Sequence, residues 1–323
     1  MILNTVAVNL KDCPPLASLG SSNLPAADRQ RFEKLFAEGV SFEKQGSPAE
    51  AARTFEQAAQ IDACFAELQF RWADCLLRLT NSAARQHFQL TRDDDALPFR
   101  ADSRINSLIR QAVERPAERR LVLCDAEATL QAHSPDGIPG AESFFEHVHF
   151  RPEGNCLLGR LWAERVERLL PDTRAKDASP DWASRDACDR LLGLSLWNRV
   201  QVLDSVIARM NQPPFSSQLN NVARREELER EARDLRERGT GPGAVAAARE
   251  EFEAAIRRSP ADPNLHENYA RFLESVGDTK QAIIECQKVA QQMPRNFNSS
   301  SSLAVCSGST ANQLRRKRFF AKR

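Results

Sequence analysis

The segment from His133 to Gly154 holds the residues of this chain whose types and spacing best suit proton transfer. It contains three of the five histidines and follows an apolar stretch. Glu146 precedes His149 by three residues, a spacing at which a carboxylate can hold one imidazole nitrogen while the other nitrogen accepts a proton. By spacing alone, a surface histidine beside an acid is the commoner interpretation.

Metal binding is a second chemistry that this segment suggests. His147 and His149 would face one side of an extended chain, but the sequence suggests no third ligand. The eight cysteines include no C-x-x-C pair and no histidine at zinc-ligand spacing, so thiols in a reducing compartment are expected. We therefore expect neither a metal site nor a cofactor. The cysteines are Cys13, Cys64, Cys75, Cys124, Cys156, Cys188, Cys286 and Cys306.

Two apolar stretches predict strands that would position this segment. Ile2 to Leu10 form a nearly continuous run with β-branched members, which is typical of a strand buried in a parallel sheet. Leu121 to Cys124 repeat the signature and are followed by Asp125. Because α/β folds place their sites beyond the carboxyl ends of parallel strands, Asn9, Asp12 and Asp125 are candidates to line a cleft. Loop capping is the commoner role for such residues.

Helical periodicity fills the sequence between the two predicted strands. It runs from Ala26 to about Arg92 and is broken only at Gly46 and Pro48, which predicts two or more helical hairpins. A strand, a helical block and a second strand indicate that the helices are inserted in an α/β domain. Further helices are expected at Leu157–Leu170, within Trp182–Met210, at Val222–Arg238 and within Val245–Met293.

A period of 34 residues marks the last third of the chain. Pro260 and Pro294 are 34 residues apart, and an alanine stands twelve residues before each. This is the length of a tetratricopeptide repeat, in which the small residue lets two helices approach closely and the proline ends the second helix. A generic helical hairpin with alanines at close crossings is the alternative. The block between the strands has the same spacing at Gly39, Phe42, Gly46, Ala51, Phe55 and Ala58.

Aromatic and histidine side chains inside the predicted repeats are expected to be structural. Phe55 and Trp72 fall at core positions, and His87 and His266 lie within repeat helices. We interpret all four as packing residues and not as ligand anchors.

Several segments around the candidate pair match a known sequence pattern. They are Glu146 to Phe150 followed by Pro152 to Asn155, and also Asn4–Leu16, Phe99–Asn106 and Asp136–Gly140. Together with the repeats, they resemble a bacterial subfamily of SGNH (GDSL-type) hydrolase-like proteins that carry tetratricopeptide repeats, over most of residues 2–295. In that family an acid precedes the catalytic histidine by three residues. The resemblance therefore implies that His149 is the general base and that Glu146 is its orienting acid.

The nucleophile of this family is missing from the pattern. SGNH enzymes take a serine from a glycine-aspartate-serine-like block, and an oxyanion-hole glycine and asparagine from two later blocks, none of which is present. Ser21 after Gly20 is the nearest serine in a glycine context, but it lies in an expected linker. We therefore expect the chain to be the C-terminal portion of a longer protein, without hydrolase activity in its present form.

These patterns predict a mainly α-helical fold with an α/β remnant, in which tetratricopeptide hairpins are inserted in, and follow, an incomplete SGNH-like three-layer α/β domain. Two strands are too few for a stable parallel sheet, so an unpaired edge open to self-association is expected. The expected parts are the α/β domain at 1–20 and 99–170, inserted hairpins at 26–97, a helical linker at 171–212, a charged helix with a C-terminal repeat at 213–297, and a flexible basic tail at 298–323.

Composition narrows the classes of function. The 323 residues carry a formal net charge of +1, so the chain lacks the overall positive charge that is typical of proteins that bind nucleic acid specifically. No apolar run approaches the 18 residues of a membrane span, and the N-terminus lacks the basic segment of a signal peptide. A cytoplasmic location is the default expectation, although a preceding segment could carry a membrane anchor. Six basic residues lie in the last nine, at Arg315, Arg316, Lys317, Arg318, Lys322 and Arg323.

Two functional hypotheses follow. The first is an interaction scaffold whose helical surfaces bind a protein or peptide partner. The alternative is a portion of an active SGNH-type esterase or acyl hydrolase, whose serine and oxyanion-hole blocks lie upstream. The missing serine block favours the scaffold for this polypeptide.

Overall fold

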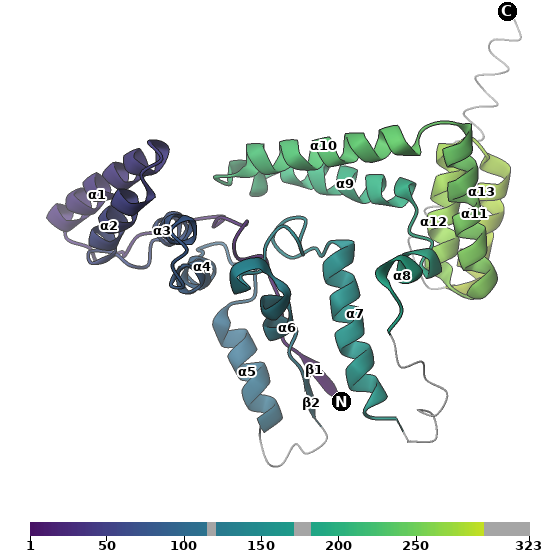
Figure 1. Cartoon of the computed structure of the whole chain (residues 1–323), viewed down its shortest axis with the longest axis horizontal. Coiled ribbons are helices and arrows are strands. Elements are labelled where there is room, and N and C mark those ends of the chain that lie inside the picture. The colour runs from purple at the N-terminus through teal and green to yellow at the C-terminus, as the bar shows by residue number, and fades with distance from the viewer. Residues whose placement is uncertain (115–120, 171–181, 294–323) are drawn as a thin grey trace, which may run out of the picture. The chain divides into compact units, whose positions relative to one another are not determined.

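The computed structural model describes residues 1–114, 121–170 and 182–293, and these residues are mainly α-helical (Figure 1). The chain forms two compact units. Unit 1 comprises Met1–Trp182 and Arg209–Arg224, and unit 2 comprises Ala183–Ala208 and Arg225–Arg323. The predicted basic tail at 298–323 lies outside the described residues.

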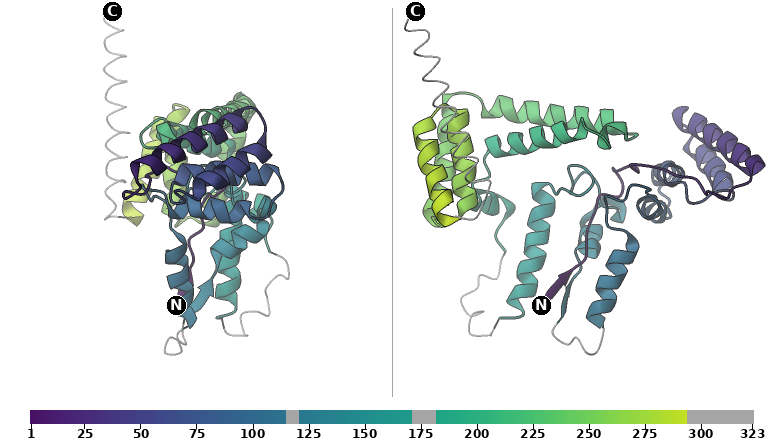
Figure 2. Two further views of the ribbon diagram at one scale, coloured as in Figure 1. Left: turned by 90° about the vertical axis from the view of Figure 1, so that its left-hand side faces the viewer. Right: turned by 180° about the vertical axis from the view of Figure 1, so that it is seen from behind.

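Unit 1 contains a small parallel sheet. Strand β1 (Ile2–Asn4) pairs with β2 (Val122–Cys124), with Ile2 opposite Val122 and Asn4 opposite Cys124. The expectation of parallel pairing between strands on either side of a helical block is therefore met. Helices α5 (Ser103–Glu114) and α7 (Pro152–Glu167) both contact this sheet (Figures 1 and 2).

The first strand is shorter than the apolar run predicts. Only three residues of the run join the ladder, and Thr5 to Leu10 continue as irregular extended chain. Their backbone groups find scattered partners, since Asn9 N donates to His147 O and Leu10 N donates to Pro139 O. In the described part of the chain the sheet has two strands, and the three-layer domain that the resemblance implies is not observed there.

Four helices form two consecutive hairpins between the strands, as the periodicity predicts. They are α1 (Ala26–Lys44), α2 (Pro48–Ala59), α3 (Ala66–Arg78) and α4 (Ala84–Asp93), and each packs on the next. Gly39 allows the α1–α2 crossing, because a Cβ atom there would lie 2.5 Å from the ring of Phe55. Gly46 turns between these helices at φ +74°, where glycine has no steric penalty.

The hairpins bury a continuous apolar core. Phe55 and Phe88 are completely buried, which confirms the prediction that Phe55 is a core residue. Trp72 is partly buried and packs against the edge of this core. Val8, Leu10 and Ile138 join the same cluster, which attaches the hairpins to the chain that follows β1.

Two helices of unit 1 were not anticipated, and a third begins earlier than expected. The first two are α5 and the short α6 (Ala126–His133). The third is α7, which begins at Pro152, whereas the sequence predicts a start at Leu157. Asp125 caps α6, since its carboxylate accepts a hydrogen bond from Ala128 N. The loop after α6 includes a 3-10 turn (Pro135–Gly137).

Unit 2 is entirely helical in its described part. It contains α8 (Arg185–Leu191), most of α9 (Leu196–Met210) and of α10 (Asn221–Gly239), and then α11 (Pro242–Arg258), α12 (Pro263–Ser275) and α13 (Thr279–Gln292). Helices α12 and α13 form the hairpin expected from the 34-residue period, with Gly277 at their turn. Tyr269 and Phe272 of this hairpin share a buried cluster with Phe252 of α11, and the partly buried Trp197 of α9 packs against that cluster.

His266 is a buried structural residue, as predicted. Its ring is 2% exposed and contacts the equally buried Glu285 carboxylate through Nδ1 at 2.5 Å. Nε2 lies 3.0 Å from the carbonyl oxygen of Pro260. The imidazole thereby ties α12 to α13 and to the turn before α12.

The described helices include none with the length and hydropathy needed to span a bilayer. The seven cysteines in the described residues are thiols, and Cys306 lies outside those residues.

Candidate functional site

A tight loop between Phe144 and Phe150 carries the predicted pair. Its two ends form an isolated antiparallel bridge, and their rings stack with centroids 4.7 Å apart. Inside the bridge, Phe145 N donates a 2.9 Å hydrogen bond to His149 O. These contacts fix the backbone that presents Glu146, His147 and His149.

Asn9 attaches this loop to the segment that follows β1. Its backbone N donates to His147 O at 3.0 Å, and its side-chain amide donates to Glu146 O at 2.8 Å. Arg100, which is buried, donates to the carbonyl oxygens of Asn9 and Cys13. The sequence suggests that Asn9 lines a cleft, whereas in the structure Asn9 is buried and fixes the loop through hydrogen bonds.

The carboxylate of Glu146 is buried and contacts two imidazoles. Its Oε1 meets Nδ1 of His149 and its Oε2 meets Nδ1 of His147, while Val148 N donates to Oε2 at 3.2 Å. Burial raises the pKa of this carboxyl group, but the hydrogen bond and charge of His147, the charge of His149 and the Val148 amide outweigh that effect. They lower the pKa to about 2, so Glu146 is an anion at neutral pH.

His149 is half-exposed, and the structure brings it together with Glu146 as the sequence predicts. The side chain of His149 is 51% exposed, compared with 4% for Glu146. Arg209, which sequence reasoning did not single out, lies beside the ring, with Nη1 2.9 Å from Nε2. The same Nη1 is 3.9 Å from Glu146 Oε1. No local signal could have revealed Arg209, because it is 60 residues away from His149.

No serine hydroxyl is bonded to His149 in the part of the chain that the structure describes. Ser21 instead donates its hydroxyl to Asp62 Oδ1 at 2.9 Å and its backbone N to Asp62 Oδ2 at 2.7 Å. The carboxylate also accepts from Cys64 N at 3.2 Å. Ser21 therefore anchors the segment before α1.

A second candidate site is a recess of about 560 Å³ beside α1. Three phenylalanines give it an apolar wall, since Phe65 packs edge-on against Phe32 and Phe36 with centroids 5.5 and 5.4 Å apart. Arg29 and Glu33 are exposed at the same recess, one turn apart on α1. The repeat pattern did not predict this recess, because part of its lining comes from residues that precede α1. These residues are Ser21, Ser22 and Leu24. Its lining residues are Gly20, Ser21, Ser22, Leu24, Arg29, Phe32, Glu33, Phe36, Asp62 and Phe65.

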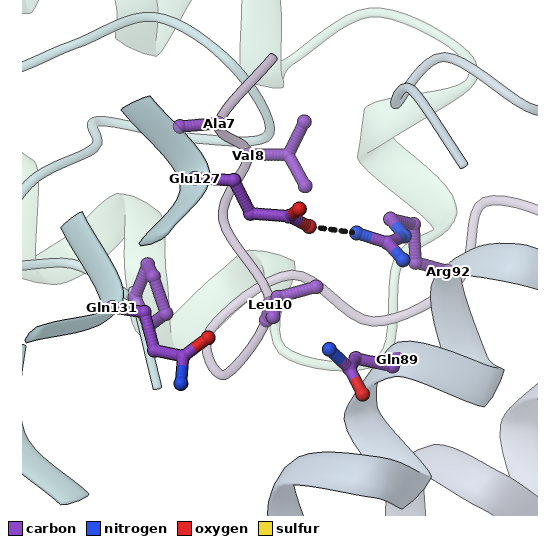
Figure 3. Close-up of a pocket in the computed structure, with 8 residues that line it drawn as sticks. Ala7, Val8, Leu10, Gln89, Arg92, Glu127 and Gln131 are labelled. Carbon is purple, nitrogen blue, oxygen red and sulfur yellow. Dashed lines mark hydrogen bonds and ion pairs between the residues drawn. The ribbon is translucent and has the colours of Figure 1, made fainter. Parts of the chain in front are cut away.

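A third hollow, between the hairpins and the segment after β1, is too small to hold a ligand. Figure 3 shows Glu127 directed toward Arg92 across this hollow, with Glu127 Oε1 3.2 Å from Arg92 Nη1. The volume is about 10 Å³, room for at most a water molecule. Arg92 is 1% exposed and also pairs with Asp93, so this group is structural.

Comparison with known proteins assigns no family. No family model matches the chain, and no curated protein matches it. Solved structures that align include a thermophilic TPR protein of Thermus thermophilus, at 13% identity and a TM-score of 0.21, covering 85% of this chain and 98% of that one. The TPR2AB domain of yeast Sti1 in its pHSP90 complex aligns at 12% identity and a TM-score of 0.22, covering 87% of this chain and 85% of that one.

A third alignment is to the Cut9–Hcn1 hetero-tetramer of the APC/C, at 12% identity and a TM-score of 0.23, covering 85% of this chain and 42% of that one. Superpositions of this quality carry no argument about fold or partners. The helical hairpins in this chain are shown by the packing between its consecutive helices and by the position of Gly39 at the α1–α2 crossing.

Proposed function

We propose that this chain is a helical-repeat scaffold that binds a peptide segment of a partner protein in the recess beside α1. The observation that carries the proposal is the recess itself, whose volume of about 560 Å³ lies in the range of sites that bind small ligands or peptide side chains. Helical repeats typically use such surfaces to bind extended or helical peptides.

The lining of the recess indicates the chemistry of the ligand. Phe36 and Phe65 are only partly buried and form an apolar surface open to a ligand. Burial of a leucine or phenylalanine side chain against such a surface is worth about 1.5–3 kcal/mol. Arg29 and Glu33 offer one charge of each sign beside it. We infer a peptide with a bulky apolar anchor flanked by polar residues.

One side of the recess is fixed by hydrogen bonds between two of its lining residues. Asp62 is 3% exposed and fixes Ser21 through two hydrogen bonds. A wall that is already ordered reduces the entropy lost when a ligand binds.

A peptide library displayed on phage tests this function. Selected peptides should share a bulky apolar anchor, and Ser22→Trp, which places a large ring at the exposed mouth of the recess, should weaken their binding at least tenfold. Ser22→Ala is the matched control and should bind as the wild type does. Failure to select any peptide whose binding is sensitive to Ser22→Trp would refute the proposal.

A second candidate function rests on Glu146 and His149. A buried carboxylate against Nδ1 of a half-exposed imidazole is the arrangement that lets Nε2 accept a proton from a hydroxyl nucleophile. We propose that the pair serves in SGNH-type ester hydrolysis when a serine is supplied to it. Arg209 would have to withdraw from Nε2 for that step.

A serine-reactive fluorophosphonate probe tests the second candidate on the protein from its native source. Labelling should disappear in His149→Ala and persist in His133→Ala, which removes an exposed histidine outside the loop. An unlabelled native polypeptide would reject the hydrolase function and leave the scaffold function untouched.

A further inference from the structure

The loop between Phe144 and Phe150 brings three metal-binding side chains to one point. A carboxylate oxygen of Glu146 and one ring nitrogen each of His147 and His149 lie within 4.8 Å of one another. The sequence suggested two histidines without a third ligand, and the structure adds Glu146 as that ligand.

His147 provides an independent indication of a ligand. The residue is 6% exposed, and its buried Nδ1 faces the Glu146 carboxylate, which it contacts at Oε2. Its ring is held by Phe99 and Phe215, with the Phe215 centroid 4.8 Å away. A buried imidazole nitrogen that faces a carboxylate and a second imidazole belongs to a convergent set of nitrogen and oxygen donors, which is what a divalent metal ion requires.

We propose that Glu146, His147 and His149 bind one divalent transition-metal ion, with Zn²⁺ as the ion that this donor set favours. Two imidazoles and one carboxylate are the ligands of open zinc sites, which keep a fourth position for water or substrate. The half-exposed side of His149 is where that fourth position would face solvent.

Two neighbouring residues affect cation binding by this loop in opposite directions. Asn9 holds the carbonyl groups of Glu146 and His147, so the ligand backbone is already ordered in the way that outer-shell hydrogen bonds order known metal sites. Arg209 places a positive charge 3.9 Å from Glu146 Oε1. Its side chain is 45% exposed and has room to turn into solvent.

The proposal goes beyond both functions above. Metal binding would occupy the Glu146 carboxylate and a ring nitrogen of His149, so the metal-bound form could not use this pair for proton transfer. The scaffold function does not involve this loop.

Titration of the full chain with Zn²⁺ by calorimetry, and with Co²⁺ by visible absorption, tests the site. We expect one equivalent to bind, with Co²⁺ bands typical of nitrogen and oxygen ligands and without the strong near-ultraviolet band of thiolates. His149→Ala should weaken binding at least tenfold without unfolding the chain, because this side chain is half-exposed. His133→Ala is the control and should bind as the wild type does.

Arg209→Gln gives a test in the opposite direction. Removal of the neighbouring cation should tighten metal binding several-fold, since like charges repel at this range. The proposal is overturned if the wild-type chain binds no equivalent, if His149→Ala binds as tightly as the wild type, or if the Co²⁺ spectrum shows thiolate ligands.

Discussion

The side-chain amide of Asn9 donates a 2.8 Å hydrogen bond to the carbonyl oxygen of Glu146, 137 residues further along the chain. The same side chain accepts from Asp12 N at 3.0 Å, and Asn9 is completely buried. One residue therefore joins the segment after β1 to the loop that carries the candidate site.

Replacement of Asn9 should destabilise the chain and loosen this loop. Asn9→Leu removes the side-chain partner of Asp12 N and of the Glu146 carbonyl oxygen, and a buried polar group without a partner costs about 1–3 kcal/mol. Urea unfolding followed by circular dichroism measures the loss. Asn23→Leu, at an exposed position, should change stability by less than about 0.5 kcal/mol, and equal effects of the two changes would contradict the role of Asn9.

Gly39 should tolerate no side chain. A Cβ atom at this position would lie 2.5 Å from the ring of Phe55, so Gly39→Ala should cost about 1–3 kcal/mol through overpacking. The control is Gly159→Ala in α7, where a Cβ would meet nothing within 4 Å. That change should stabilise the helix by about 0.5–1 kcal/mol, and thermal unfolding of both variants gives the comparison.

Protonation of Asp125 at low pH should reduce the stability of unit 1. Burial raises the pKa of this carboxyl group, but hydrogen bonds from Arg110, Ala128 N and Thr5 outweigh it, so the pKa is lowered below the usual 3.8. A lowered carboxyl pKa adds stability that is complete above the unfolded-state pKa and is lost as the pH falls through the folded-state pKa. The melting temperature of the wild type should therefore fall as the pH is lowered below about 4.

Asp125→Asn is the variant that isolates this effect. Asparagine retains a side-chain oxygen for the α6 cap but has no charge for Arg110, whose Nε lies 2.9 Å from Asp125 Oδ2. The melting temperature of Asp125→Asn should be lower than that of the wild type at pH 7, and the two should converge as the pH is lowered below about 4. Parallel pH profiles for the two proteins would show that the ion pair contributes nothing.

Removal of His266 should destabilise unit 2. The ring contacts the Glu285 carboxylate and the Pro260 carbonyl oxygen, and breaking a buried pair by removal of one partner costs about 3–5 kcal/mol. Lys288 and Gln281 still contact Glu285, so we expect His266→Leu to fall at the lower end of that range. His133→Leu is the exposed control in urea unfolding, and a His266→Leu variant as stable as this control would refute the prediction.

The helical part of the fold could be predicted from the sequence because its determinants are local. Gly39, Ala51 and Phe55 lie in adjacent helices and mark the same crossing that the structure contains. The spacing between Pro260 and Pro294 likewise matches the α12–α13 hairpin. By contrast, the end of β1 could not be predicted, because the ladder stops where the partner strand stops and not where the apolar run ends.

The candidate site was predictable only in its contiguous part. Glu146 and His149 are three residues apart, so the pattern of residue types indicated their contact. Arg209, Asn9 and Asp62 act through contacts 41 to 137 residues away, which no local pattern specifies. The hydrogen bonds from Ser21 to Asp62 show that Ser21 anchors a loop. The sequence context of Ser21, a serine after a glycine, did not indicate this role.

The parallel pairing of β1 with β2 has a consequence for the order of folding. Thr5 and Asp125 adjoin the two strands, hydrogen-bond to each other and are 120 residues apart, so a ribosome that adds about 5–20 residues per second needs on the order of ten seconds to supply the second strand after the first. The helices α1–α4 pack mainly on their neighbours in sequence, so these hairpins can form during that interval. We therefore expect nascent chains arrested before residue 121 to contain protease-resistant hairpins and an unprotected N-terminal segment.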